Sequence, residues 1–535
     1  MPRWPGPSPP PASGAAAGSY RPAAAGAGGN RHRRRPPSRQ GKPGRESPNA
    51  ARASAYDTGE LSEQAGRLGS RTVLDASLIL AVRVVSRLVA LVVVLKLASH
   101  LGAERYGQYA TLIAYSALVS VVADFGLSSL YTREAARAPA RLPIYLATLL
   151  LGKLPLAAAA AALLGGALLS ARLGGLFLPG ALLLALTTYA TLIRNTFYAQ
   201  GRLEFEAIAI LAETVIQAGG IFLGARFGQG IAYFVWVYAA SYGFTCVYSL
   251  LVIRVAGLAQ GSTGVDGQLL RTWLKLAFPF ALGSFLTNLY FRADVPILQH
   301  FRAYQEVGWY QLAYKPFEAL QFVPLAVQAV VYPLLGVYHQ EPGPRLAVAY
   351  GRFFKILILL GWPLSVGTLL LAHPIGRLFR LFPESEPSLR ILSLAIVFLF
   401  ANSCFTAMLY AIDRQDLFAW ATGLAVVVNV GLNLILIPLY GYLAASATTV
   451  VTEAAFSVAG WYFVGRRFKL PLVRLSWRIL LAGLIMGVVL VPLAGRSIFL
   501  SAPSGALVYG LGLVLLRAIE REELDLFLRG LRLRR

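Results

Sequence analysis

The sequence predicts an all-α integral membrane protein of about fourteen transmembrane helices, arranged as two six-helix lobes followed by two C-terminal helices. Three observations support this fold class. The 535 residues are 56% hydrophobic and only 14% charged, whereas soluble domains carry about 25% charged residues. From Thr72 onward, apolar stretches of about 20 residues alternate with short polar breaks. Segments of the first half of the chain also have similar counterparts in the second half.

The predicted spans are apolar runs long enough to cross about 30 Å of hydrocarbon. Lipid offers no hydrogen bonds to open backbone groups, and the runs lack the alternation of barrel strands, so each is expected to be a helix. We place them near residues 74–99, 108–130, 143–170, 175–194, 204–225, 231–253, 276–300, 308–335, 353–376, 389–411, 417–438, 442–464, 478–494 and 499–517.

The chain is expected to divide into five segments. Residues 1–71 are rich in Pro, Ala, Gly, Ser and Arg and poor in large apolar side chains, which predicts a disordered basic cytoplasmic tail. The other four are an N-lobe with helices 1–6 (72–255), a cytoplasmic linker (256–275), a C-lobe with helices 7–12 (276–465), and helices 13 and 14 with a basic C-terminal tail (466–535).

Basic residues outnumber acidic ones by 49 to 25, a formal net charge of +24. Most of the excess lies in the N-terminal tail and in short loops, which fits membrane topology and anionic lipid headgroups better than nucleic acid. The loops that we assign to the cytoplasm hold basic clusters, namely Arg133, Arg137 and Arg141; Arg254, Arg271 and Lys275; Arg345 and Arg352; and Arg466, Arg467, Lys469 and Arg474. We therefore expect both termini in the cytoplasm, membrane lipids as partners, and no nucleic acid.

Two pairs of similar segments indicate an internal repeat. LGAERYGQYATLIAY, after the first span, resembles FRAYQEVGWYQLAYK, after the seventh, and aligns Gly107 with Gly308. YAQGRLEFEAIA resembles YAIDRQDLFAWA and aligns Arg202 with Arg414. Six spans separate the copies, so the two lobes are expected to share one orientation in the membrane, with a substrate path between them.

Cations near the middle of a span are costly, about 2.5 kcal/mol or more each, so each needs a partner or a water-filled cavity. Arg83 and Arg87 share one face of the first span by their i, i+4 spacing. Because like charges repel, we expect that face to meet water or an anion; the alternative is that both side chains extend to an interface. Lys153 lies near the middle of the third span.

Helices 7 and 8 are expected to be antiparallel neighbours, which places Arg292, Asp294, Lys315 and Glu318 at similar depths. Lys315 and Glu318 share a face, whereas Arg292 and Asp294 point in different directions. A purely structural ion pair is the alternative to a functional role for these four residues.

Two further carboxylates, Glu213 and Glu453, lie near mid-span in helices 5 and 12. A carboxyl group in a low dielectric can cycle protons, as coupling to an ion gradient requires. Either group could instead neutralise a nearby cation. Asp124 and Arg194 lie nearer the cytoplasmic ends of their spans, where a topological or salt-bridge role is expected.

Motifs for chemistry are absent from the sequence. There is no phosphate loop of the form GxxxxGK[ST], no HExxH and no paired-cysteine metal motif. We therefore expect no enzyme activity, no cofactor and no bound metal.

At the repeat positions the sequence resembles the polysaccharide transporter family, the O-antigen and teichuronic-acid type flippases, of the multidrug/oligosaccharidyl-lipid/polysaccharide exporter superfamily. The matching segments are LGAERYGQYATLIAYSALVSVVADFGLSSLYTREAAR, FRADVPILQHFRAYQEVGWYQLAYKPFEAL with the following YPLL, and NVGLNLILIPLYGYLAASATTVVTE; the resemblance covers roughly residues 72–500.

This resemblance implies an alternating-access carrier with a central cationic cavity, in a bacterial cytoplasmic (inner) membrane. Its cargo would be an undecaprenyl-diphosphate-linked oligosaccharide, and its further partners a polysaccharide polymerase and glycosyltransferases. The cations expected at the cavity are Arg83, Arg87, Lys153, Arg292 and Lys315. The carboxylates expected to couple ions or to pair charges are Asp294, Glu318, Glu213 and Glu453.

Three alternatives remain open at the level of sequence. A peptidoglycan-precursor flippase or a drug/cation antiporter of the same superfamily would share the fold, although a cationic drug would prefer an acidic cavity. A membrane glycosyltransferase or polymerase would normally carry a catalytic acid in a large loop, and no loop here is long enough to form a domain.

Overall fold

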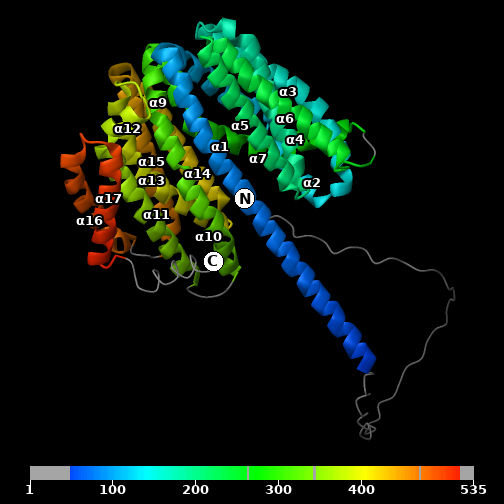
Figure 1. Ribbon diagram of the computed structural model, residues 1–535. Helices are drawn as coiled ribbons and strands as arrows, with labels where there is room; N and C mark the ends of the chain where they lie inside the picture. The colour runs from blue at the N-terminus through cyan, green and yellow to red at the C-terminus, as the bar shows by residue number, and fades with distance from the viewer. Residues whose placement is uncertain (1–47, 262–263, 341–344, 469–471, 519–535) are drawn as a thin grey trace, which may run out of the picture. The chain divides into compact units, whose positions relative to one another are not determined.

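The computed structural model describes residues 48–261, 264–340, 345–468 and 472–518. The chain forms two compact units, Met1–Leu68 and Gly69–Arg535. Every regular element in the described residues is a helix, and short turns join most of them (Figure 1). The predicted all-α membrane fold is therefore confirmed.

The helices are α1 (Pro48–Asp124), α2 (Leu127–Arg137), α3 (Leu142–Ser170), α4 (Phe177–Ala199), α5 (Leu203–Arg226), α6 (Ile231–Val255), α7 (Gly267–Arg292), α8 (Asp294–Phe301), α9 (Tyr304–Leu320), α10 (Phe322–Gln340), α11 (Arg345–Leu370), α12 (Ala372–Leu378), α13 (Ser385–Ala411), α14 (Gln415–Tyr440), α15 (Tyr442–Gly465), α16 (Leu472–Leu490) and α17 (Ile498–Leu515).

The predicted count of fourteen spans is not confirmed. Within the described residues, eleven helices are long and apolar enough to cross a membrane, or twelve if the bent pair Tyr304–Ala329 and Leu334–Gln340 is one span. The first two predicted spans lie largely in α1, which is kinked at Gly102 (φ 74°, ψ 169°) and is not among the eleven. The kink, rather than a loop, separates these two apolar runs.

Two predicted boundaries differ from the structure. Residues 1–47 of the predicted tail lie outside the described residues, but the tail's last part is helical because α1 begins at Pro48. This stretch is rich in Ala, Leu, Glu and Arg, which favour helix even where little apolar surface is available. The linker is also shorter than predicted, since Asp266 caps α7 by accepting hydrogen bonds from the backbone of Gln268 and Leu269.

Proline interrupts the seventh and eighth predicted spans. Pro296 lacks the N–H that would bond to the carbonyl of Arg292, and the helix breaks at Ala293, between α7 and α8. Pro324 has the same effect on the helix that ends at Leu320, and α10 begins anew at Phe322. Each break frees backbone groups and changes the direction of the side chains that follow it.

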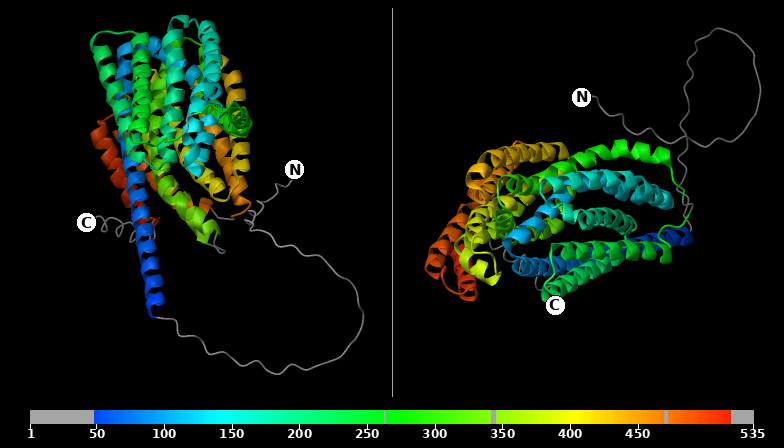
Figure 2. Two further views of the ribbon diagram at one scale, coloured as in Figure 1. Left: turned by 90° about the vertical axis from the view of Figure 1, so that its right-hand side faces the viewer. Right: turned by 90° about the horizontal axis from the view of Figure 1, so that it is seen from above.

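Within the second unit the helices pack in two groups. Helices α2 to α6 contact one another, and α11, α13, α14, α15 and α9 form the second group, with α16 against α11 and α17 against α16. Helix α7 contacts α2 and α3 of the first group and α14 of the second. The right-hand view of Figure 2 shows the cyan helices together and the yellow-to-red helices together, with green helices in both groups. The two-lobe division of the chain stays a prediction.

The aligned repeat glycines meet where α1 crosses α9. A Cβ on Gly107 would collide with the carbonyl oxygen of Tyr304, and a Cβ on Gly308 would collide with the carbonyl oxygen of Ala103. Only glycine allows two helix backbones to approach so closely. The crossing therefore depends on both members of the aligned pair.

The second aligned pair shares one local structure. Arg202 precedes α5 and Arg414 precedes α14, with similar backbone angles (φ −100°, ψ 63° and φ −107°, ψ 51°). Each follows a residue of positive φ, Gly201 at 65° and Asp413 at 55°. Each backbone N–H also closes the preceding helix by bonding to a carbonyl five residues back. The sequence similarity thus reflects the same helix-to-helix turn.

Candidate functional site

The site is built around a cavity of about 360 Å³ that we call the central cavity. Helices α1, α4 and α6 form one wall of it, and α7 and α9 form the other. The first wall carries aromatic, apolar and hydroxyl side chains, and the second carries two cations and an amide. The polar and aromatic residues that line it are Tyr106, Tyr109, Ser116, Ser120, Thr187, Tyr238, Tyr242, Arg292, Gln311 and Lys315.

Arg292 and Lys315 are the cations of the central cavity. Both pair with Glu318, at 3.5 Å from the guanidinium and 2.7 Å from the ammonium. These ion pairs bring together three of the four residues that were predicted at similar depths, and the depth itself stays a prediction. Arg87 is exposed and makes no hydrogen bond or ion pair with any described residue, while its charge acts on the Glu318 carboxylate. Two cations therefore share one carboxylate, which leaves an excess of one positive charge in the pair.

Asp294 faces away from this cluster. It follows the helix break at Ala293, is buried, and accepts hydrogen bonds from the Tyr310 hydroxyl and from the backbone N–H of Val295. The prediction that Arg292 and Asp294 point in different directions is confirmed. Asp294 fixes the start of α8 against α9 and does not pair with the cavity cations.

A second cavity, of about 200 Å³, adjoins the first and contains the Glu318 side chain. It shares Arg292 with the central cavity. It shares Thr287, Phe291 and Gln321 with a third cavity of about 330 Å³, which we call the C-terminal cavity. The three cavities are therefore neighbours, and the wall residues that they share belong to α7 and to the turn between α9 and α10.

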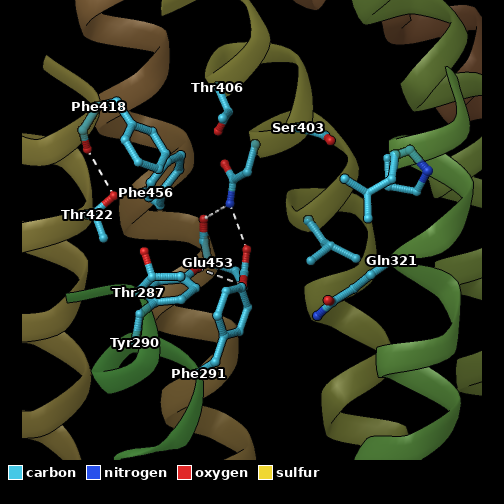
Figure 3. A pocket seen from close by; sticks show the side chains of 14 residues that line it. Thr287, Tyr290, Phe291, Gln321, Ser403, Thr406, Phe418, Thr422, Glu453 and Phe456 are labelled. Carbon is cyan, nitrogen blue, oxygen red and sulfur yellow. Dashed lines mark hydrogen bonds between the residues drawn. The ribbon is translucent and has the colours of Figure 1, made fainter. Parts of the chain in front are cut away.

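The C-terminal cavity holds a buried carboxylate. Glu453 accepts hydrogen bonds from the Tyr290 hydroxyl and the Asn402 amide, each at 2.7 Å. Phe418 and Phe456 form one side of the cavity, with Gln321 across from them (Figure 3). Two roles were predicted for Glu453, proton exchange and the neutralisation of a cation. No ion pair among the described residues includes Glu453, so the structure gives it no cation to neutralise.

Glu213 is paired. It lies 3.0 Å from Arg194 and accepts a hydrogen bond from Thr245 at 2.7 Å. Arg194 also approaches Glu206, at 3.7 Å, and Glu206 in turn lies 3.8 Å from Arg83. Glu213 therefore neutralises a nearby cation, which was one of its two predicted roles. The salt bridge expected of Arg194 is confirmed.

Arg83 takes part in that network rather than in the central cavity. Its guanidinium donates to the Tyr198 hydroxyl, which donates to Glu206 at 3.3 Å. Its side chain is nonetheless 51% exposed. Sequence reasoning missed Glu206 because it lies in the first turn of α5, beside a loop where acidic residues are common.

Lys153 lines none of the three cavities and is wholly buried. Its ammonium lies 2.7 Å from Asp124 and donates to the Ser128 hydroxyl and the Thr188 carbonyl. All three N–H groups of the ammonium are thereby used. The structure gives Lys153 a structural ion pair in place of the predicted position in the cationic cavity.

Two matches to protein families bear on this arrangement. The family model described as "Polysaccharide biosynthesis protein" matches residues 73–339, and the one described as MatE matches residues 279–435. No curated protein matches the sequence significantly. In the described residues, no group of three or more His, Cys, Asp or Glu is placed to hold a metal ion.

Solved structures share the fold. The chain is similar to "Lipid II flippase MurJ, inward closed conformation", with a TM-score of 0.67 and 16% identity over 82% of this chain and 99% of that one. It is similar to an inward-facing multidrug resistance MATE family transporter of the MOP superfamily, with a TM-score of 0.58 and 14% identity over 72% and 94%. A MOP superfamily transporter from Pyrococcus furiosus has a TM-score of 0.50 and 14% identity over 74% and 94%.

Proposed function

We infer, because the chain belongs to the multidrug/oligosaccharidyl-lipid/polysaccharide exporter superfamily and matches its polysaccharide biosynthesis family, that it is a flippase for a lipid-diphosphate-linked oligosaccharide. It moves this cargo, of the undecaprenyl-diphosphate type, by alternating access from the inner to the outer leaflet of a bacterial cytoplasmic membrane. The enzymes that assemble and polymerise the oligosaccharide are its expected partners.

The observation that carries this proposal is the charge of the central cavity. Arg292 and Lys315 line it, and no carboxylate does so among the described residues. Arginine and lysine bind phosphate oxygens through charge-assisted hydrogen bonds. Arg292 and Lys315 together carry one positive charge more than the Glu318 carboxylate neutralises, so a phosphate oxygen can bind to them while Glu318 stays in place. A cationic drug would meet repulsion at the same place.

Glu453 is the best candidate for ion coupling. It is buried, polar contacts hold it in place, and it has no cation partner among the described residues. Such a carboxylate can take up and release a proton without breaking an ion pair. We therefore propose that the C-terminal cavity serves coupling and that the central cavity binds the cargo.

The proposal is tested with Lys315→Ala, Arg292→Ala and Arg87→Ala in a strain that depends on this chain for surface polysaccharide. Each variant should reduce export severalfold at normal protein abundance, because each removes a cation that the diphosphate needs. Arg137→Ala is the matched control, since Arg137 is an exposed cation outside the three cavities. Normal export from all three variants would contradict the cavity assignment.

Cargo identity needs a second measurement. Proteoliposomes with the purified chain should flip a prenyl-diphosphate oligosaccharide faster than the peptide-bearing peptidoglycan precursor or a cationic drug. Preference for the precursor would identify the alternative flippase, and drug transport alone would identify an antiporter.

A further inference from the structure

The α1–α6 wall of the central cavity is unusually rich in tyrosine. Tyr238 and Tyr242 are i, i+4 neighbours on one face of α6, and both are half-buried. Tyr106 and Tyr109 of α1 are 1% and 7% exposed, and their rings lie 6.2 Å apart. The Tyr109 ring also lies 6.2 Å from that of Tyr238. The buried Tyr109 ring therefore packs between those of Tyr106 and Tyr238, and both α6 tyrosines line the cavity.

Two polar side chains at the cavity lack partners. The Ser116 hydroxyl is buried and makes no hydrogen bond. Gln311, which is 5% exposed, makes no side-chain hydrogen bond with any described residue. A buried hydroxyl in a folded protein is almost always paired. The Ser116 hydroxyl and the Gln311 amide both line the central cavity without a partner, which indicates that a ligand supplies one.

We propose that this wall binds the sugar nearest the diphosphate of the cargo, and this rests on the proposed function. A pyranose ring has apolar C–H faces and hydroxyl edges. Tyr238 and Tyr242 contact a face of the ring, while Ser116 and Gln311 bond to its hydroxyl groups. Arg292 and Lys315, on the opposite wall, hold the phosphates to which the sugar is joined.

Size and lining support this class of ligand over others. A volume of about 360 Å³ is at the lower end of small-molecule sites, about 300–1,000 Å³, so it admits part of the cargo only. A prenyl chain would leave Ser116 and Gln311 unpaired. A cationic amphiphile would find no carboxylate among the described lining residues.

The test uses the full-length chain in lipid nanodiscs with two probes that share one short prenyl chain. One probe is the prenyl diphosphate, and the other carries a disaccharide on that diphosphate. Tyr242→Leu and Tyr238→Leu keep apolar volume but remove the ring, and each should weaken binding of the disaccharide probe by roughly 3- to 10-fold. Binding of the sugar-free probe should stay unchanged.

Matched controls lie on the same helix. Tyr248→Leu changes a tyrosine of α6 that lines none of the three cavities, and it should leave both affinities unchanged. Ser116→Ala should weaken only the disaccharide probe, whereas Ser249→Ala, which removes another buried unpaired hydroxyl, should weaken neither. Tyr242→Phe should retain most of the affinity because the ring remains.

Two outcomes overturn the inference. Equal loss of both probes in the tyrosine variants would mean that the wall does not distinguish sugar from phosphate, and full retention of both would mean that it binds neither. The proposed function fails separately, if the unmodified chain binds neither probe. A misfolded leucine variant would show altered thermal unfolding. The inference would then be tested by Tyr242→Phe, which should keep most of the affinity for the disaccharide probe, and by Ser116→Ala, which should lose part of it.

Discussion

Buried cations in this chain differ by what surrounds them. The Lys153 ammonium has three hydrogen-bond acceptors and no exposed surface. Arg292 and Lys315 are 26% and 20% exposed and share a single carboxylate. The first cation is saturated by the protein, whereas the other two can accept a further anion. The sequence predicts all three near the middle of a span, so position along the chain does not separate them. The partners of each cation, which the structure shows, distinguish a structural charge from a candidate functional one.

Lys153→Met should destabilise the fold by about 3–5 kcal/mol, because it leaves Asp124 as an uncompensated charge. Thermal unfolding of the purified chain in detergent measures this loss. The double variant Lys153→Met/Asp124→Asn should recover part of it, since no charge then remains unpaired. If Lys153→Met unfolded at the same temperature as the unmodified chain but lost transport, Lys153 would be assigned to cargo binding instead.

Glu453→Gln should abolish the response of transport to an imposed ion gradient, because an amide cannot exchange a proton. The amide nitrogen would also face a donor, Tyr290 or Asn402, at a cost of about 1–3 kcal/mol. Transport into proteoliposomes with and without a gradient is the measurement. Glu386→Gln, at an exposed ion pair with Arg390, is the control. A gradient response retained in Glu453→Gln would assign coupling elsewhere.

At the scale of elements, two kinds of local feature place the site. Each cation of the central cavity lies shortly before a helix break caused by proline. Arg292 precedes the break at Ala293, and Lys315 precedes the break at Gln321. The break after Arg292 directs that side chain to the cavity and Asp294 away from it. The glycine crossing of Gly107 and Gly308 brings α1 against α9 near the same cavity. Breaks and crossings thus set which charges can meet.

Gly308→Ala should destabilise the α1–α9 crossing by roughly 1–3 kcal/mol or more, since its Cβ would collide with backbone that cannot rotate away. Gly219→Ala is the control: it lies inside α5, and a Cβ there meets nothing within 4 Å. Thermal unfolding of the two variants gives the comparison. Equal stability would show that the two backbones separate without cost.

Much of the element pattern could be predicted from sequence. Helix positions from α3 onward follow the apolar runs, because a lipid-exposed helix needs a continuous apolar stretch. The helix cap at Asp266 and the helix break before Pro296 can each be recognised from the residue type. Hydropathy does not show either feature, because it averages over the apolar run in which each residue lies or to which it is adjacent. The helical continuation of α1 before the first apolar run has no hydropathy signal at all.

At the scale of the whole molecule, the loop cations set the expected orientation. The basic clusters lie at the ends of α2, α6 and α15 and at the starts of α7, α11 and α16. Alternate ends of successive spans lie on the same side of a membrane, so these clusters share one side. By the positive-inside rule we expect that side to be the cytoplasmic one and predict both termini there.

Thiol labelling in intact cells tests this orientation after Cys246 and Cys404 are replaced. A membrane-impermeant reagent should label Gln305→Cys, between α8 and the body of α9, in intact cells. It should label Arg137→Cys, at the end of α2, only after the membrane is made permeable. Both native residues are exposed, so access is decided by the side of the membrane; the reverse pattern would invert the orientation.

The sequence by itself determined the helical membrane class, most of the apolar helices and the repeated segments, and it predicted which charges lie within those helices. These follow from hydropathy and periodicity, which are local along the chain. The tertiary structure alone decided which of those charges meet. Arg83 contacts Tyr198, 115 positions away, and Lys153 contacts Asp124 rather than the cavity. Only packing between helices that are distant in sequence creates such pairs. In our proposal the cargo binds at the central cavity, where polar side chains remain without a partner.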